Sequence, residues 1–349
     1  MLCRVGFRLS SLTTCRLLSR HLTKMATVPV KTSIGCMEFG RQCAADQAKQ
    51  FINICMEHDV YDFDTAYGYS GGKSEEIMGD MDCLKDSKVF IATKANPWGK
   101  GLVFDSVLEQ LNESLKRLKR DSVDLFYLHA PEHTTPIEET LDAVNQLYEE
   151  GKFESFGLSN YSSWQVAEIY YLCKMNNYPV PTVYQGMYNP VTRDIERELF
   201  PCLRRFGIAF YAYNPLAGGL LTGKHRYEDR DSGNIQHGRY AGTGEWADVY
   251  VNRFWKKPLF DLLDKLRGTL DRIYGEGKVT LIDASLRWMY HHSKLDGACG
   301  DAVIIGASSV KHLEENLKST KHGPLHEDVV ELFEETWGIL QGDCPLYFR

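Results

Sequence analysis

The sequence lacks several features that would assign it to common classes of protein. No two of its 10 cysteines have the C-x-x-C spacing, which argues against a zinc module or a thioredoxin-type redox site. Scattered cysteines of this kind are typical of a protein that keeps its thiols reduced. No apolar run approaches the length of a transmembrane helix. No basic stripe follows the N-terminus, and with a net charge of −7 this argues against nucleic acid as a partner.

Residues 1–30 differ in composition from the rest of the chain. They are rich in Leu, Ser and Thr, contain no acidic residue and carry five positive charges: Arg4, Arg8, Arg16, Arg20 and Lys24. This segment resembles a mitochondrial transit peptide and lacks the continuous apolar stretch of a secretory signal. The alternative is a disordered extension with Met25 as a second start. We therefore expect a mitochondrial or cytoplasmic protein with one folded domain over residues 31–349.

Short β-rich runs alternate with longer amphipathic segments through the rest of the sequence. Eight runs are expected to be strands: 33–37, 60–64, 88–93, 123–128, 154–158, 182–186, 208–213 and 302–306. Several of them are apolar almost throughout, which is typical of strands buried on both faces of a parallel sheet. Helical patterns are expected over 104–119, 136–150, 162–175, 194–206, 279–291 and 309–318. One more helix and a short tail are expected after residue 326.

The alternation of eight strands with helices indicates an α/β fold with right-handed crossovers. A doubly wound sheet and a closed barrel both satisfy this pattern, and the count of eight favours a (β/α)8 TIM barrel. No G-x-G-x-x-G follows the first strand, which weakens the case for a doubly wound dinucleotide-binding fold. The longest connection lies between the seventh and eighth strands. We expect its Gly-rich and charged stretch, 224–248, to be a lid or a cofactor clasp.

Residues suited to proton-coupled hydride transfer lie at or just past the ends of three successive strand-like runs. Asp64 and Tyr69 lie in VYDFDTAYGY, Lys94 ends VFIATK, and His129 ends VDLFYLH. Strand ends converge on one mouth of a parallel barrel, so we expect these side chains to share one site. Reduction of a carbonyl also needs a hydride, which no side chain carries. A nicotinamide cofactor would have to supply it.

A tyrosine can supply the proton that such a reduction needs. Its free pKa is about 10, and a nearby ammonium stabilises the phenolate and lowers that pKa. We therefore expect Tyr69 as the acid, with Tyr67 as its rival, Lys94 as the group that tunes it and Asp64 as the lysine's partner. His129 would orient the carbonyl. Taken alone, each residue has a structural explanation such as a helix cap or a turn, but four together at successive strand ends favour a catalytic site.

Longer motifs make the pattern specific. In chain order they are DTAYGYSGGKSEEIMG, IATKANPW, DLFYLHAPEH, GLSNY, VYQGMYNP and AYNPLAGGLLTGK. Together they resemble the aldo-keto reductase superfamily, and within it the branch of aflatoxin aldehyde reductases, which also reduce succinic semialdehyde. The resemblance covers about residue 30 to 349. It implies a (β/α)8 barrel that uses NADPH, reduces aldehydes such as aflatoxin dialdehydes, succinic semialdehyde and carboxybenzaldehydes, and forms a homodimer.

The resemblance also implies roles for individual residues. The catalytic tetrad would be Asp64, Tyr69, Lys94 and His129, because the family tyrosine follows the aspartate by five residues. Three residues would hold the nicotinamide amide, with Tyr213 under the ring: Ser159, Asn160 and Gln185. The loop that would wrap the pyrophosphate contains Asn214, Pro215, Leu216, Gly218, Gly219, Leu220, Gly223 and Lys224. The adenosine end and its 2′-phosphate would contact Arg239, Ser308, Ser309, His312 and Asn316. The substrate would contact His129, Tyr250, Arg253 and Arg349.

Elementary chemistry supports part of this assignment. Ser308 and Ser309 open a predicted helix, where backbone N–H groups and the helix dipole favour a phosphate. A plain N-cap is the structural alternative for Ser309. Arg253 and Arg349 could bind a carboxylate in two-pronged fashion.

Three other functions match parts of the sequence. The segment Gly218 to Lys224 satisfies G-x-x-x-x-G-K, but His225 follows where a P-loop needs Ser or Thr. Aldo-keto barrels also occur as non-enzymatic β subunits of potassium channels, in which NADPH binding could persist. A metal hydrolase would need clustered ligands at the strand ends, and His291-His292 lies within a predicted helix. We therefore expect no metal site.

Overall fold

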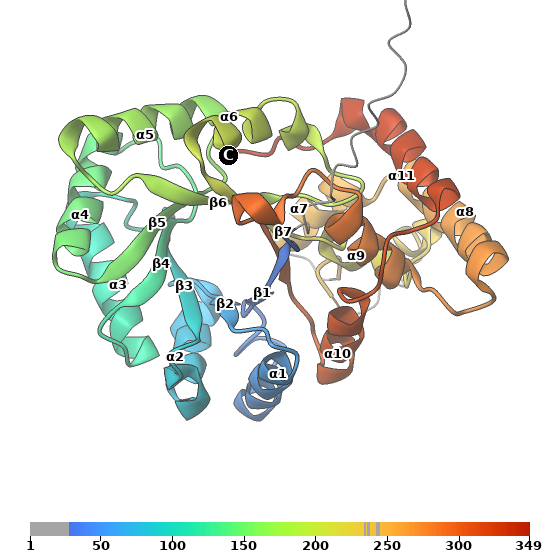
Figure 1. Ribbon diagram of the computed structural model, residues 1–349, viewed down its shortest axis with the longest axis horizontal. Coiled ribbons are helices and arrows are strands. Elements are labelled where there is room, and N and C mark those ends of the chain that lie inside the picture. The colour runs from blue at the N-terminus through green and yellow to red at the C-terminus, as the bar shows by residue number, and fades with distance from the viewer. Residues whose placement is uncertain (1–27, 234, 236–237, 242–244) are drawn as a thin grey trace, which may run out of the picture.

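The computed structural model describes residues 28–349, except residues 234, 236–237 and 242–244. The described residues form eight parallel strands that close into a barrel in sequence order, with helices arranged around it (Figure 1). The strands are β1 (Lys31–Gly35), β2 (Asp62–Asp64), β3 (Phe90–Ala95), β4 (Val123–Leu128), β5 (Phe153–Ser159), β6 (Pro181–Met187), β7 (Ala209–Tyr213) and β8 (Ala302–Ile305). The (β/α)8 prediction is confirmed. The predicted N-terminal extension lies, over residues 1–27, outside the described residues.

The barrel closes where the first strand meets the last. β1 pairs with β8 from Lys31 opposite Ala302 to Ile34 opposite Ile305. The seam between β7 and β8 has two paired positions, whereas β6 and β7 share five. The long connection expected between the seventh and eighth strands is present and occupies residues 214–301.

The helices largely follow the predicted pattern. They are α1 (Ala45–Glu57), α2 (Lys73–Gly79), α3 (Phe104–Leu118), α4 (Ile137–Glu149), α5 (Ser163–Asn176), α6 (Leu199–Phe206), α7 (Glu245–Phe254), α8 (Lys257–Tyr274), α9 (Leu281–His291), α10 (Val310–Ser319) and α11 (Glu327–Leu340). The helix expected over 194–206 is divided into a 3-10 turn, Asp194–Glu196, and α6. Pro201 explains the late start of α6, because proline is tolerated only in the first turn of a helix.

Side chains alternate between the inside and the outside of the barrel along each strand. Inside the barrel, below the carboxyl ends of the strands, lies a small, mostly apolar cluster that includes two tyrosines. Its members are Ala92, Leu125, Tyr127, Val183, Tyr211, Ala302 and Ile304. Lys94 follows Ala92 by two residues in β3, and Gln185 follows Val183 by two residues in β6. Lys94 and Gln185 therefore also point into the barrel. Asp64 in β2 joins them there. Because side chains alternate along each strand, three polar side chains lie next to this apolar cluster, on the side of the carboxyl ends of the strands.

Asp62 is a further carboxyl group on the inner face of β2. It accepts hydrogen bonds from the Ser33 hydroxyl at 2.7 Å and the Tyr211 hydroxyl at 3.2 Å. Burial raises the pKa of Asp62 from its usual range to about 7. Between the unfolded and folded pKa values the native state therefore binds more protons than the unfolded chain. The contribution of Asp62 to stability falls as the pH rises from about 4 to about 7.

We expect Asp62→Asn to remove this pH dependence. Its unfolding free energy should exceed that of the wild type increasingly from pH 5 to pH 8, by on the order of 4 kcal/mol at most. Urea unfolding of both proteins across this range measures the difference. Parallel stability curves for the two proteins would contradict the raised pKa.

Candidate active site

A buried ion pair lies at the centre of the barrel mouth. Lys94 Nζ lies 2.5 Å from Asp64 Oδ1 and donates to the Thr65 carbonyl at 2.6 Å. The second carboxylate oxygen of Asp64 accepts from Gln185 Nε2 at 2.8 Å. The Lys94 side chain is completely buried. Burial lowers the pKa of Lys94, and the Asp64 carboxylate opposes that shift. The carboxylate thus favours the charged form of this buried lysine.

The structure distinguishes the two candidate tyrosines. Tyr69 is half-buried, and its ring centre lies 5.1 Å from Lys94 Nζ and 5.6 Å from the His129 ring. The ring of Tyr67 instead lies 4.7 Å from the guanidinium carbon of Arg117, on α3. Tyr69 is therefore the tyrosine that the fold places between the lysine and the histidine.

The electrostatics of Tyr69 differ from the sequence-based expectation. We predicted that Lys94 lowers the pKa of Tyr69, but burial raises this pKa and the Asp64 carboxylate adds to the rise, while Arg239 opposes it. The physical reason is that burial disfavours the charged phenolate, and the Asp64 carboxylate, which pairs with Lys94, repels it as well. The phenol is consequently held protonated at neutral pH, the form that a proton donor needs.

His129 stands next to this phenol as a neutral imidazole. Its ring lies between Tyr69 and Trp98, whose ring centre is 5.4 Å away. Burial lowers the pKa of His129 well below its usual value, and Lys94 and Arg349 add to the effect. Its buried Nδ1 has no hydrogen-bond partner among the described residues. A neutral imidazole can donate one hydrogen bond to a carbonyl oxygen without delivering a proton.

Residues expected to hold the nicotinamide lie at the ends of β5, β6 and β7. Asn160 has a left-handed backbone with φ of 63°. Its amide donates to the His129 carbonyl and to Ser159 Oγ, both at 2.9 Å, and accepts from the Tyr213 hydroxyl at 2.7 Å. With Gln185 bonded to Asp64, all four expected residues connect to the tetrad.

The loop expected to hold the pyrophosphate has an unusual backbone. Asn214, Ala217, Gly218, Gly219 and Gly223 all have positive φ. A Cβ at Gly218 would lie 2.6 Å from the Tyr250 ring, so this position requires glycine. Turns of this kind point successive N–H groups at one concave surface, which suits an anion. The remaining expected residues of this set are Pro215, Leu216, Leu220 and Lys224, and of these Leu220 is fully buried.

The serines at the start of α10 and Arg239 were both expected to contact the adenosine end of the cofactor. In the structure they have different neighbours. At the start of α10, Ser309 Oγ accepts from the His312 backbone N–H, and Ser308 Oγ lies 3.3 Å from His312 Nδ1. Ser309 is thus an N-cap. Arg239 instead bonds to Asn214 Oδ1 at 3.0 Å and to the Tyr250 hydroxyl. It also opposes the pKa rise of Tyr69, so Arg239 lies on the tetrad side of the site.

The expected substrate residues are contributed by α7 and the end of the chain. The Arg349 guanidinium lies 5.5 Å from the Trp98 ring centre, and its backbone N–H donates to the Asn160 carbonyl at 3.0 Å. Tyr347 Oη accepts from the Ser163 N–H, and Figure 1 shows the chain ending beside α5 and α6. The charges of Arg253 and Arg349 both oppose the burial that raises the pKa of Tyr213 to about 12. Two cations therefore lie near the expected nicotinamide position.

Trp98 is a residue that we did not single out from the sequence. Its large, half-exposed side chain stands four residues past Lys94 and contacts both His129 and Arg349. The sequence feature that could have identified it is its position in the motif IATKANPW, just after the end of a predicted strand. Its ring can form one wall of the space above the tetrad.

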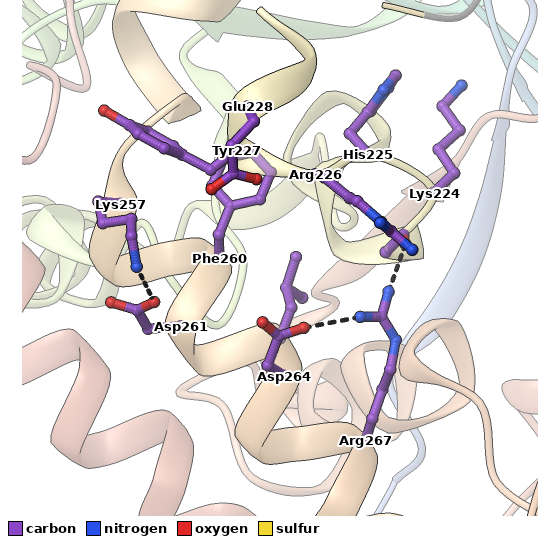
Figure 2. A pocket seen from close by; sticks show the side chains of 12 residues that line it. Lys224, His225, Arg226, Tyr227, Glu228, Lys257, Phe260, Asp261, Asp264 and Arg267 are labelled. Carbon is purple, nitrogen blue, oxygen red and sulfur yellow. Dashed lines mark hydrogen bonds and ion pairs between the residues drawn. The ribbon is translucent and has the colours of Figure 1, made fainter.

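A cavity of about 560 Å³ lies between the segment Gly223–Glu228 and α8. Figure 2 shows Lys257 paired with Asp261 and Arg267 paired with Asp264. Arg267 also donates to the Gly223 carbonyl. Gly223 and Lys224 of the pyrophosphate loop line this cavity, but the tetrad does not. Within the described ranges, no three His, Cys, Asp or Glu side chains lie together as a metal site would need, and no helix there could span a membrane.

Comparisons with known proteins agree with this geometry. The model of the Aldo/keto reductase family matches residues 31–337. The chain is 53% identical to rat aflatoxin B1 aldehyde reductase member 2 over 322 residues, which are 91% of this chain and 87% of the rat protein. It is 53% identical to the human protein of that name over 324 residues, 92% of this chain and 90% of the relative. Human aflatoxin B1 aldehyde reductase member 4 is 50% identical over 335 residues, 95% of this chain and all of the relative. The chain is therefore an oxidoreductase and belongs to the aldo/keto reductase family, in the branch of these relatives.

Proposed function

We propose that this protein reduces aldehydes to alcohols with NADPH, and that Tyr69 is the proton donor. The observation that carries the proposal is the convergence of Tyr69, the buried Lys94–Asp64 pair and a neutral His129 at one barrel mouth. The relatives named aflatoxin B1 aldehyde reductases support an aldehyde as the substrate.

Each tetrad residue has a separate task in this proposal. The residues at this mouth would hold a nicotinamide, which would supply hydride chemistry when bound. Tyr69 gives its phenolic proton to the carbonyl oxygen, and His129 holds that oxygen by a hydrogen bond. Lys94 stabilises the phenolate that forms, and Asp64 keeps Lys94 charged and aimed. The water-poor setting of the buried pair strengthens these interactions.

The cofactor would lie across the barrel mouth from β5 to α10. Ser159, Asn160 and Gln185 would hold the nicotinamide amide. The left-handed turns after β7 would receive the pyrophosphate. The start of α10 suits a 2′-phosphate, which supports NADPH over NADH. Arg239, expected there from the sequence, would instead act near Tyr250 and Tyr69.

The two arginines at the mouth indicate which aldehydes bind well. Arg253 and Arg349, with Tyr250, favour aldehydes that also carry a carboxylate, such as succinic semialdehyde and 2-carboxybenzaldehyde. Aflatoxin dialdehydes are the neutral class suggested by the relatives' names. We also propose a homodimer in the mitochondrion or cytoplasm. Three large apolar side chains exposed on α5 offer a surface for such an assembly: Trp164, Tyr171 and Met175.

Turnover with matched aldehydes tests the proposal. NADPH consumption should be faster with succinic semialdehyde than with butyraldehyde, which has a methyl group in place of the carboxylate. Arg253→Ala should raise KM for succinic semialdehyde by roughly tenfold or more, because a hydrogen bond to a charged group contributes about 1.5–3 kcal/mol. Its KM for butyraldehyde should change by less than about twofold. Equal effects on both aldehydes would contradict a carboxylate contact.

Tight NADPH binding by the wild type without turnover of any aldehyde would instead favour the alternative function, a cofactor-binding regulatory subunit.

A further inference from the structure

The loop that carries Tyr69 has little regular structure of its own. Ser70, Gly71 and Gly72 follow each other in left-handed conformations, with φ of 53°, 66° and 96°. Such a segment makes few repeating backbone hydrogen bonds, so its position depends on contacts with neighbouring elements. The Ser70 hydroxyl provides one of them, to the Phe39 carbonyl at 2.8 Å.

Arg117 provides a second group of contacts, from the last turn of α3. Its Nη1 donates to the Tyr67 carbonyl at 3.1 Å, and its guanidinium lies against the Tyr67 ring. A Cβ at Gly72 would lie 2.6 Å from the same guanidinium, so the backbone packs directly on it. Although Arg117 belongs to a basic run in the sequence, its side chain is only 16% exposed. One arginine thus contacts the loop on both sides of Tyr69.

Arg117 pairs with Glu113 on its own helix and with Glu75, and the second pair connects this loop to the strand that carries Lys94. Arg117 Nη1 lies 3.2 Å from Glu75 Oε2. Glu75 is completely buried, and its other oxygen accepts from the Thr93 hydroxyl at 2.6 Å. Thr93 directly precedes Lys94 in β3. The chain of contacts therefore runs from the Tyr69 loop through Arg117 and Glu75 to the residue next to the catalytic lysine.

We infer that Arg117, acting with Glu75, is a positioning residue that fixes Tyr69 relative to Lys94. Arg117 touches none of the tetrad side chains, and its effect is exerted through the Tyr67 carbonyl and the backbone at Gly72. The inference rests on the proposed role of Tyr69 as proton donor. A displacement of about 1 Å at a reacting group can cost on the order of 10²-fold in rate, so loss of this support should act on the chemical step.

The test compares Arg117→Met with a control that creates the same kind of defect elsewhere. Arg204 pairs with Asp301, which is also completely buried and directly precedes β8. Both Arg117→Met and Arg204→Met leave a buried carboxylate without its arginine and should lower the melting temperature. Only Arg117→Met should lower kcat for an aldehyde, by about 10- to 100-fold. The dissociation constant for NADPH, from fluorescence titration, should stay within about threefold of the wild type in both variants.

A deuterium isotope effect separates positioning from general damage. With NADPH deuterated at the transferred hydrogen, the effect on kcat should be larger in Arg117→Met than in Arg204→Met, because the chemical step has become slower. Arg117→Lys should have an intermediate kcat, since lysine can pair with Glu75 but cannot stack on Tyr67 and bond its carbonyl at once. If Arg117→Met does not fold, Arg117→Lys and Glu75→Gln carry the same comparison. Equal kcat values in the Arg117 and Arg204 variants would overturn the inference, whereas full turnover of Tyr69→Phe would instead reject the proposed function beneath it.

Discussion

Replacement of Tyr69 by Phe should lower kcat by about 10²- to 10⁴-fold, the usual contribution of a general acid. The phenol is protonated at neutral pH, since its free pKa is about 10 and burial and Asp64 raise that pKa further, so the wild type enters the reaction with its proton in place. Phe keeps the ring beside Lys94 and His129 but removes that proton. NADPH binding should be almost unchanged, because the hydroxyl is the one group removed. Single-turnover NADPH oxidation and fluorescence titration of NADPH measure the two quantities separately.

Tyr67→Phe is the matched control for this experiment. Tyr67 lies two residues away in the same loop, yet its ring packs on Arg117 and not on Lys94. We expect its kcat to stay within a fewfold of the wild-type value. If Tyr67→Phe lost turnover while Tyr69→Phe kept it, the acid would be the other tyrosine.

Replacement of Lys94 by Met should have the largest combined effect on activity and stability. It leaves the Asp64 carboxylate buried without a cation, and breaking a buried pair in this way costs about 3–5 kcal/mol. The phenolate of Tyr69 would also lose its nearest ammonium, 5.1 Å from the ring centre. We expect a loss of at least about 10²-fold in kcat, together with a lower unfolding free energy in urea.

A double variant separates the two consequences of losing Lys94. In Lys94→Met combined with Asp64→Asn, the unpaired charge is gone, so most of the lost unfolding free energy should return. Turnover should not return, because the phenolate still lacks a cation. Recovery of activity together with stability would mean that Lys94 serves the fold alone. Unchanged stability in the single variant would mean that the Asp64–Lys94 pair contributes little to the folded state.

The sequence predicts the barrel well because its signals are local and repetitive. All eight predicted runs are strands, and Asp64 and Lys94 could be assigned to one site because they lie at or near the ends of neighbouring strands. The predicted helix over 194–206 is too long at its N-terminal end. The apolar pattern suggested one continuous helix, but Pro201 fits only in the first turn, and α6 begins at Leu199. The pKa of Tyr69 was predicted in the wrong direction, because the sum of burial, Asp64 and Lys94 depends on distances that no spacing reveals.

Contacts between distant segments were the part that the sequence could not supply. Arg117 lies in a stretch that is typical of a solvated helix end, and only the tertiary structure brings it over the Tyr67 carbonyl, 50 positions earlier. Arg239 was expected to contact the adenosine end of the cofactor, and in the structure it bonds to Asn214 and Tyr250. In both cases a long arginine side chain could reach several partners, and packing decides among them.

The way the barrel closes also bears on how the site is assembled during synthesis. β1 must pair with β8, whose first residue lies 271 positions further along the chain. All four tetrad residues belong to the first 129 positions, whereas the loop after β7 and the start of α10 come much later. A ribosome-bound chain therefore holds the complete set of acid, lysine, carboxylate and histidine long before it has a closed wall around them. Contacts so distant in sequence form slowly, so the emergence of β8 marks the point at which a finished pocket becomes possible.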